Sequence, residues 1–352
     1  MANDDLKSNL AFGNRHSALP APAAEPLQRT WTEAEAFAYC SQLTRSHYEN
    51  FPVGSSLIPK ELRPAIHSLY AFMRTADDFS DENRRAGDEA ERMAWLESWE
   101  QMLTECVEGK AKHPILIALR VTLERHQLPV QWLRDLLHAF KMDVTVRRYA
   151  TAEELFTYCR YSANPVGRLV LTLFGYRDEA LYRLSDHVCT GLQLANHWQD
   201  VAVDLKKDRI YLPQEDMNKF GVTVTSLLNL ASPRLRGSLP TGEGETFSRR
   251  EKAPDATTTL ASARGVVAEG PDEAKNFRQL LAFEVIRTRE LFAQGRHLPE
   301  KVTGRLKWEL RFTWQGGVRI LDKIEQAHYD VLHQRPVVTK ADWLGIAART
   351  LF

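Results

Sequence analysis

The sequence has few cysteines, no long apolar run and no excess of either charge, and each shortage argues against a class of protein. Its 352 residues contain four cysteines, with no C-x-x-C motif, at Cys40, Cys106, Cys159 and Cys189. This spacing argues against a disulfide framework or a cysteine-based zinc site, and it is typical of a reducing cytoplasm. No run of about 18 apolar residues occurs, which argues against a membrane-spanning helix.

Charge is balanced, because 46 lysines and arginines face 46 aspartates and glutamates. Without a general positive field, nucleic acid is not an expected partner. The N-terminus carries Asp4 and Asp5 and lacks an apolar core segment, which is not the pattern of a secretory signal. We therefore expect a cytoplasmic protein. Peripheral membrane contact stays open, although no strongly basic amphipathic helix indicates it.

The dominant pattern is helical. From Trp31 to about Phe220, and again after residue 276, apolar residues recur every three or four positions, and prolines separate the stretches. We predict an all-α protein with one large domain at 31–352. The Ala/Pro-rich residues 1–30 are predicted to be a disordered tail. Residues 231–273, rich in Gly, Pro, Ser, Thr and charge, are predicted to be a disordered insertion.

A first acidic cluster closes an apolar stripe in residues 62–82, LRPAIHSLYAFMRTADDFSDE. The apolar residues that share one face of this predicted helix are Leu62, Ile66, Leu69, Tyr70 and Met73. Continuing that face leads to Asp77 and then Asp81. Two residues four positions apart lie one above the other, about 6 Å apart along the axis. Both carboxylates are therefore expected on the face that points inward.

A second polar line runs through residues 189–213, CTGLQLANHWQDVAVDLKKDRIYLP. Its members, on one face of a predicted helix, are Gln193, Asn196, Asp200 and Asp204. The apolar residues around them are Leu192, Leu194, Ala195, Trp198, Val201, Val203 and Leu205. A helix that is apolar on most sides is usually buried. A buried carboxylate without a partner is costly, so these acids need a cation or a proton.

Acidic pairs four positions apart also arise by chance on solvated helix faces, so one such pair carries little weight. Two pairs that each continue a core-facing stripe are a stronger signal. Magnesium suits an oxygen-only set, because it favours carboxylates, waters and substrate phosphates. We therefore predict that Asp77 and Asp81, together with Asp200 and Asp204, hold Mg²⁺ ions.

Such a centre would bind a diphosphate and stabilise it as a leaving group. Arg74 and Arg209 could add charge-assisted hydrogen bonds. Structural roles explain the presence of both arginines equally well. Arg74 could form an ion pair with Asp78, and Arg209 could be a favourable positive charge at the C-terminal end of a helix. A carbocation left behind needs a dry pocket with aromatic faces. The candidate walls, each of which could instead be ordinary core, are Phe51, Tyr70, Phe72, Tyr161, Trp198 and Tyr211.

Two of these segments resemble known motifs. YAFMRTADDFSDE (70–82) is similar to the first aspartate-rich motif of the squalene/phytoene synthase family, the head-to-head trans-isoprenyl diphosphate synthases. GLQLANHWQDVAVDLKKDRIYLP (191–213) is similar to its second motif. The resemblance covers about 45–225 and 275–345. It implies a single isoprenoid-synthase helical bundle around a central cavity, with a prenyl diphosphate as substrate.

Carried over by position, the resemblance also implies residue roles. The implied magnesium ligands are Asp77, Asp78, Asp81, Asn196, Asp200 and Asp204. Gln193 would lie in the central channel. The residues implied to contact the diphosphate or the cation are Tyr70, Arg74, Arg209 and Tyr211. Arg335, in HQRPVV, matches a further diphosphate-binding arginine of the family.

Within the family, HYENFPVGS (47–55) and YCRYSANPVGRLVL (158–171) resemble the bacterial hydroxysqualene synthases of hopanoid biosynthesis. The implied reaction ionises presqualene diphosphate, rearranges the cation and captures it with water, giving hydroxysqualene and diphosphate. Pro165 and Gly167 are expected to break a helix and open backbone groups towards the channel, or simply to allow close helix packing. Asn164 is a candidate to hold the water.

Two alternatives stay open. One is a squalene or phytoene synthase that condenses two prenyl diphosphates, and the other is a catalytically inactive scaffold subunit. Retention of both aspartate motifs speaks against the scaffold, which has no use for buried acids. No G-x-G-x-x-G follows a strand pattern, so no dinucleotide-binding Rossmann unit is expected. This agrees with a water-quenched product, although NADPH use and partner enzymes of the same pathway stay open.

Overall fold

The computed structural model describes residues 25–46, 58–81, 89–231 and 272–351, and the statements below refer to these residues. They form helices joined by short connections, with no β-strand and one isolated bridge between Arg148 and Ile210. The all-α prediction is confirmed. The predicted tail and insertion fall largely outside the described residues, although Glu25–Gln28 forms a short 3₁₀ helix, η2.

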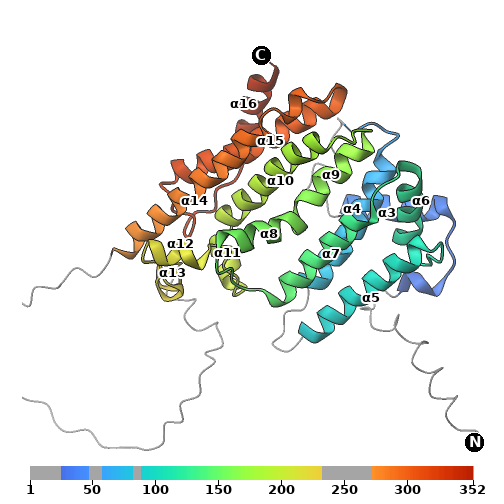
Figure 1. Cartoon of the computed structure of the whole chain (residues 1–352), viewed down its shortest axis with the longest axis horizontal. Helices are drawn as coiled ribbons and strands as arrows, with labels where there is room; N and C mark the ends of the chain where they lie inside the picture. The colour runs from blue at the N-terminus through green and yellow to red at the C-terminus, as the bar shows by residue number, and fades with distance from the viewer. Residues whose placement is uncertain (1–24, 47–57, 82–88, 232–271, 352) are drawn as a thin grey trace, which may run out of the picture.

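The helices cross the molecule roughly in chain order (Figure 1). The first group is α3 (Glu33–Ser46), α4 (Arg63–Asp81), α5 (Glu89–Val107), α6 (Pro114–His126) and α7 (Val130–Thr145). The middle group is α8 (Ala152–Ser162), α9 (Asn164–Leu173), α10 (Glu179–Gln199), α11 (Val201–Lys206), α12 (Gln214–Lys219) and α13 (Val224–Ala231). The last group is α14 (Glu273–Gly295), η5 (Leu298–Glu300), α15 (Gly304–Gln326) and α16 (Lys340–Leu351).

Prolines begin helices where the sequence predicted helix ends. Pro114 and Pro165 lie in the first turns of α6 and α9, and Pro129 is the N-cap of α7. A proline is tolerated at these positions because the first amide groups of a helix have no intrahelical acceptor. These residues therefore set the helix boundaries locally.

Helix α10 lies at the centre and packs against α8, α9, α14 and α15. It can approach α15 closely because Gly191 and Gly317 lie on either side of the Phe292 ring. A Cβ added at Gly317 would lie 2.5 Å from Cζ of Phe292. Two apolar cores result, one around α3–α7 and one around α8–α15, and Trp132 and Phe174 pack against both.

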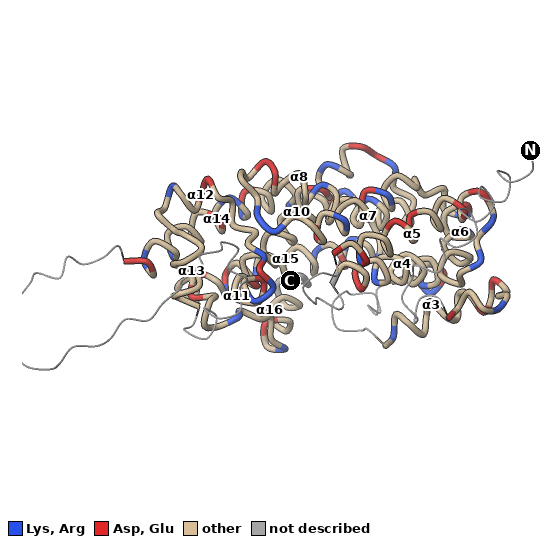
Figure 2. Tube along the Cα trace, turned by 90° about the horizontal axis from the view of Figure 1, so that it is seen from below, with Lys and Arg blue, Asp and Glu red and all other residues tan. Residues whose placement is uncertain are grey.

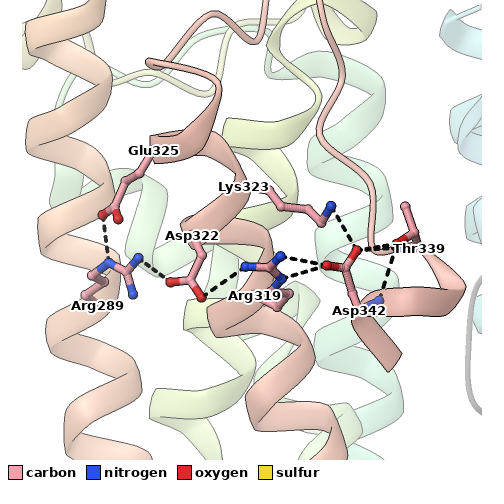
Figure 3. Close-up of polar contacts among 7 residues, drawn as sticks. All are labelled: Arg289, Arg319, Asp322, Lys323, Glu325, Thr339 and Asp342. Atoms are coloured by element: carbon pink, nitrogen blue, oxygen red, sulfur yellow. Dashed lines mark hydrogen bonds and ion pairs between the residues drawn. The ribbon is translucent and has the colours of Figure 1, made fainter. Parts of the chain in front are cut away.

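Ion pairs join the last three helices (Figure 3). Arg289 of α14 donates to Asp322 of α15 at 2.7 Å. Arg319 and Lys323 of α15 reach Asp342 of α16 at 2.7 and 2.8 Å. The Asp342 side chain is 7% exposed, and these partners lower its pKa, the lysine contact being the largest cause. The charged contacts thus dock α16 against α15.

Acidic and basic residues are interspersed over the described chain in Figure 2. All four cysteines are described and none forms a disulfide; three are buried. None of the described helices combines the length and the hydropathy needed to span a membrane.

Candidate active site

The first acidic cluster lies at the C-terminal end of α4, where Arg74 holds two carboxylates. Its Nη1 lies 3.1 Å from Oδ2 of Asp77, and its Nη2 pairs with Oδ1 of Asp78. These two side chains are 42% and 24% exposed. Asp81 is the last residue of α4, and its side chain is outside the described set. The ion pair between Arg74 and Asp78 that the spacing allowed is therefore present, extended to Asp77.

The second cluster lies at a break that the sequence did not predict. One helix was expected through residues 189–205, whereas α10 ends at Gln199 and α11 begins at Val201. Asp200 is the junction, with φ −105° and ψ 12°. The amides of Asp200 and Asp204 still bond the carbonyls four residues earlier, both at 2.9 Å. The break is thus a kink that re-aims the Asp200 side chain.

One correction concerns α11, where Val203 was expected to be part of a buried surround. Its side chain is 38% exposed, whereas Val201 and Leu205 are buried. The kink turns the short helix relative to α10, so the face predicted for a continuous helix no longer applies. Asp204 lies there partly buried, and its carbonyl oxygen accepts the amide of Arg209 at 2.9 Å.

Asp200 is held from two directions. Asn196 donates through Nδ2 to Oδ2 of Asp200 at 2.5 Å. Arg335, from the segment after α15, donates through Nη2 to the same oxygen at 3.1 Å and through Nε to Oδ1. This hydrogen bond is the largest cause that raises the pKa of Arg335. The contact brings together three residues that the sequence had assigned to one site.

The acids, if buried, were expected to need a cation or a proton. Asp77, Asp78 and Asp200 are instead half-buried and paired with Arg74 or Arg335. The physical requirement was right, because a carboxylate removed from water needs a positive partner. Guanidinium groups supply that charge here.

An apolar cavity of about 490 Å³ begins next to this cluster. Helix α10 contributes Ser185, Val188, Cys189, Leu192, Gln193 and Asn196 to its wall, and α4, α8, α9, η5 and α15 supply the rest. Gln193 and Asn196 lie on the last two turns of α10 before Asp200. One end of the cavity is therefore polar, whereas the wall towards Val188 and Leu306 is mostly apolar. Gln193 lies in the wall of this cavity.

Tyr70 and Met73 of α4 line a smaller pocket, of about 20 Å³, that shares Ile66 with the large cavity. Asp77 follows Met73 by one helical turn. Two further aromatic residues that were candidates for the cavity wall lie in the hydrophobic core. Phe72 stacks on Trp99, and the indole of Trp198 donates to Thr288. Phe51 lies outside the described residues.

The S-A-N-P-V-G segment contains the expected helix break, at Ala163, between α8 and α9. Ser162 and Ala163 line the cavity. A Cβ at Gly167 would lie 2.3 Å from Oγ of Ser185 on α10, so this glycine serves close packing. Asn164 is buried, and its Oδ1 accepts the hydroxyl of Thr190 at 2.9 Å. Asn164 is therefore tied to the α9–α10 interface.

A buried polar cluster around Asp143 of α7 was missed by the sequence. Tyr158 donates to its Oδ1 at 2.9 Å and Tyr211 to the same oxygen at 3.4 Å. The guanidinium of Arg209 bonds the Asp143 carbonyl and lies 3.9 Å from its carboxylate. Arg209 is thus more than a helix-end charge, because its guanidinium contacts Asp143 of α7. A lone aspartate in a helix carries no spacing signal that would have singled it out.

The same cluster perturbs several pKa values. Burial raises the pKa of Tyr158 and Tyr211, and the nearby charge of Asp143 adds to it. Burial, with help from Arg209, lowers the pKa of His197 to about 3. The neutral His197 ring stacks on Tyr211 with centroids 3.6 Å apart. These phenols and this imidazole therefore stay uncharged at neutral pH.

The donor chemistry at both clusters is oxygen-rich. Among the described side chains, no three His, Cys, Asp or Glu residues gather into a ready-made metal site. Carboxylates from α4 and from the α10–α11 junction are nonetheless partly exposed, and Asn196 adds an amide next to Asp200. Such a set fits Mg²⁺, which commonly takes one or two carboxylates and completes its shell with substrate phosphates and water.

Comparison with known proteins agrees with this geometry. The squalene/phytoene synthase family model matches residues 44–241 and 256–342. Among solved structures, the squalene synthase HpnC from Alicyclobacillus acidocaldarius is 36% identical with a TM-score of 0.66, covering 90% of this chain and 99% of that one. The chain therefore belongs to the squalene/phytoene synthase family and has its isoprenoid-synthase fold, as the two aspartate motifs predicted.

Two relatives of known function show which branch of the family this chain resembles. A hydroxysqualene synthase of Sinorhizobium fredii is 39% identical over 180 residues, covering 51% of this chain and 60% of that protein. A hydroxysqualene synthase of Zymomonas mobilis is 38% identical over 221 residues, covering 61% of this chain and 72% of that protein. The expected closeness to the hydroxysqualene branch is confirmed.

Proposed function

We propose that this protein is a hydroxysqualene synthase, which converts presqualene diphosphate and water into hydroxysqualene and diphosphate with the help of Mg²⁺. The observation that carries the proposal is the apolar cavity whose polar end, at Gln193 and Asn196, adjoins Asp200 and Arg335. A prenyl diphosphate has the same polarity, with an apolar chain and one highly charged end.

The charged end would be bound by arginines already in place. Arg335 and Arg74 each present a guanidinium that now pairs with carboxylates, and Arg335 is 49% exposed. Guanidinium groups bind phosphate oxygens through charge-assisted hydrogen bonds. Since carboxylates already hold each guanidinium in place, little reorganisation would be needed when a diphosphate binds.

The acids would hold the metal. The proposed Mg²⁺ ligands are Asp77, Asp78, Asp81, Asn196, Asp200 and Asp204. Bound magnesium would neutralise the diphosphate and stabilise it as the leaving group. Asn196 and Arg335 orient the Asp200 carboxylate, so its direction is set before any ligand binds.

The cavity would protect the cation. Its wall of aliphatic side chains from α4, α9, α10 and α15 excludes bulk water. Tyr70 lines the smaller pocket that shares Ile66 with this cavity, and its aromatic face can stabilise positive charge. Tyr211 and Tyr158 lie in the adjoining buried cluster, where the raised pKa values keep their hydroxyls protonated. These hydroxyls donate to Asp143, and their oxygens remain able to accept a hydrogen bond.

A squalene synthase is the second candidate, because the solved relative at 36% identity carries that name. That reaction would need a hydride donor in place of water. We place the protein in the cytoplasm, with contact to the membrane surface as a route for its apolar substrate.

The test is product analysis. The full-length protein is incubated with presqualene diphosphate and Mg²⁺ without NADPH, and the C30 products are identified by mass spectrometry. We expect a C30 alcohol and one diphosphate per turnover. Two results together would establish the second candidate instead. The protein would consume farnesyl diphosphate, and it would convert presqualene diphosphate to a C30 hydrocarbon only when NADPH is added. A control with EDTA should stop diphosphate release.

A further inference from the structure

Exposed apolar side chains gather near the C-terminal end of the described chain. Six large apolar residues of the described ranges are exposed, and three of them lie in residues 337–344. These are Val337, Trp343 and Leu344, with 46%, 44% and 74% of their surface exposed. None of the three belongs to the two apolar cores of the described residues. Single exposed apolar residues are ordinary, whereas a cluster indicates a surface of interaction.

This surface continues from α16 onto α15. The two helices pack together and lie along one edge of the molecule (Figure 1). The Trp343 ring lies against Gly316, where an added Cβ would be 3.3 Å from Cη2 of the indole. Gly316 continues the line of Trp308 and Phe312 at intervals of four residues, so the three positions share one face of α15. Trp308 and Phe312 are partly exposed, and three aromatic side chains therefore follow one another on this face.

Basic residues surround the aromatic line. Residues 301–312 contain one acid, Glu309, which lines the cavity. The basic residues of the same stretch are Lys301, Arg305, Lys307 and Arg311. On α16, Lys340 is exposed, whereas Asp342 is 7% exposed and already paired with cations of α15. The charge that this surface presents to a partner is therefore mainly positive.

We propose that the α15–α16 patch, made of Trp308, Phe312, Lys340, Trp343 and Leu344, docks the protein on an anionic lipid bilayer. Aromatic side chains, Trp above all, lie at the headgroup level of a bilayer, and basic side chains are attracted by its anionic lipids. The patch thus complements such a surface in both polarity and charge. The choice of a membrane over a protein partner rests on the proposed function, since presqualene diphosphate is itself a lipid.

The patch lies beside the cavity. Thr313 of α15 lines the cavity and precedes Gly316, beneath the Trp343 ring, by less than one helical turn. Glu309, the neighbour of Trp308 in the chain, lines the cavity as well. One face of α15 therefore borders the cavity, and the adjacent face carries the patch. Docking would bring the cavity to within about one helix diameter, 10–12 Å, of the lipid.

The sequence did not indicate this surface, because no single helix is strongly basic and amphipathic. Residues 308–312 and 340–344 come together only when α16 docks on α15, through the contacts of Arg319 and Lys323 with Asp342. A surface of a few apolar and basic side chains gives weak and reversible binding. We therefore expect an exchange of the protein between solution and membrane.

The experiment measures co-sedimentation of the full-length protein with sucrose-loaded vesicles, without substrate or Mg²⁺. One set of vesicles is phosphatidylcholine, and the other is an equimolar mixture of phosphatidylcholine and phosphatidylglycerol. We expect binding to the mixed vesicles to be about tenfold tighter, and to weaken at high salt. Leu344→Ser should weaken binding to the mixed vesicles about tenfold, because it removes one apolar side chain from the contact. Lys340→Glu should have an effect of similar size on the mixed vesicles and none on the neutral ones.

Two variants on α14 are the matched controls. Ile286→Ser removes an apolar side chain that is 58% exposed, and Arg278→Glu reverses an exposed charge. Both should bind vesicles as the wild type does. Since Leu344 is 74% exposed, Leu344→Ser should keep the far-UV circular dichroism of the wild type. Equal losses in the control and patch variants would overturn the proposal.

A wild type that binds neither kind of vesicle would also overturn it. If that wild type is a dimer in solution and Leu344→Ser makes it a monomer, the patch is instead the contact with a second copy of this chain. This vesicle assay contains no substrate, so it decides membrane docking whether or not product analysis yields a C30 alcohol. A failure to bind vesicles, in turn, leaves alcohol formation untouched.

A second readout connects docking to turnover. Presqualene diphosphate is supplied either embedded in the mixed vesicles or dispersed in detergent. For the embedded substrate we expect Leu344→Ser to raise KM about tenfold, in step with the weaker vesicle binding. For the dispersed substrate KM should stay that of the wild type. Equal changes of KM with both forms of substrate would show that Leu344 acts on the cavity, which contradicts a docking role.

Discussion

Arg335 binds the carboxylate of Asp200, which lies 135 positions earlier in the sequence. Its Nη2 lies 3.1 Å from Oδ2, and its Nε donates a hydrogen bond to Oδ1. The contact joins the segment between α15 and α16 to the kink between α10 and α11. It also places the guanidinium next to Asn196, at the polar end of the cavity. The segment after α15 thus contributes to the site at the end of α10.

Arg335→Ala should slow diphosphate release strongly. Removing one preorganised donor from a developing anion commonly costs about a hundredfold in rate, and we expect a loss of that order in kcat/KM. Arg335→Lys should recover only part of it, because lysine cannot make the bidentate contact. Arg278→Ala, at an exposed position of α14, is the control. Near-normal kinetics in Arg335→Ala would show that the arginine only holds Asp200.

Asp77→Asn and Asp200→Asn should each abolish diphosphate release while leaving the fold intact. Asparagine keeps the shape and removes the charge that a divalent cation requires. In Asp77→Asn the pair between Arg74 and Asp78 remains, so far-UV circular dichroism and Tm should change little. Glu97→Gln, on an exposed position of α5, should have no effect. Turnover close to normal in either aspartate variant would contradict the proposed metal role.

Asp143→Ala should destabilise the protein, because it leaves the buried Arg209 and two buried phenols without this acceptor. Breaking a buried pair from one side typically costs about 3–5 kcal/mol. Urea unfolding would show this as a lower midpoint. Glu100→Gln, which breaks the more exposed pair with Lys141, should cost about 1 kcal/mol or less. Equal effects of the two substitutions would show that Asp143 is not the structural centre of its cluster.

Glu284 should make stability fall as pH rises. It is fully buried on α14, and burial raises its pKa from 4.5 to about 8, with Asp216 adding to the shift and Arg287 opposing it. Between these two pH values the folded protein holds a proton that the unfolded chain has lost. The contribution of Glu284 to the free energy of unfolding should therefore decrease between about pH 5 and 8, by at most about 1.4 kcal/mol per pH unit.

Denaturant unfolding at a series of pH values checks this prediction for Glu284. Glu284→Gln, which mimics the protonated form, should flatten the profile in that window, whereas Glu290→Gln at an exposed position of the same helix should not. A difference between the wild-type and Glu284→Gln profiles that stays constant across the window would contradict the assignment.

The all-helical class and several helix boundaries could be read from the sequence, because their causes are local. Pro114, Pro129 and Pro165 begin helices through the geometry of their own rings. The apolar stripe that ends at Asp77 follows from helical spacing alone. The two aspartate motifs, being long and specific, also indicated the family.

Other features depended on which helices meet. The contact between Arg209 and Asp143, and the ion pair between Arg335 and Asp200, join residues far apart in the chain. The kink at Asp200 lies where one of these contacts is made. Spacing along one helix cannot foresee them, since the partner lies on another helix whose position follows from packing of the whole core. Asp143 was overlooked for that reason.

What the sequence determined by itself was therefore the set of helices, their apolar faces and the acidic character of two of them, because each depends on neighbours within a few turns. Only the tertiary structure decided which arginines pair with those acids and which residues line the cavity. The physical reason is that charge pairing and cavity shape depend on the relative placement of α4, α8, α10 and α15, which close packing of side chains selects.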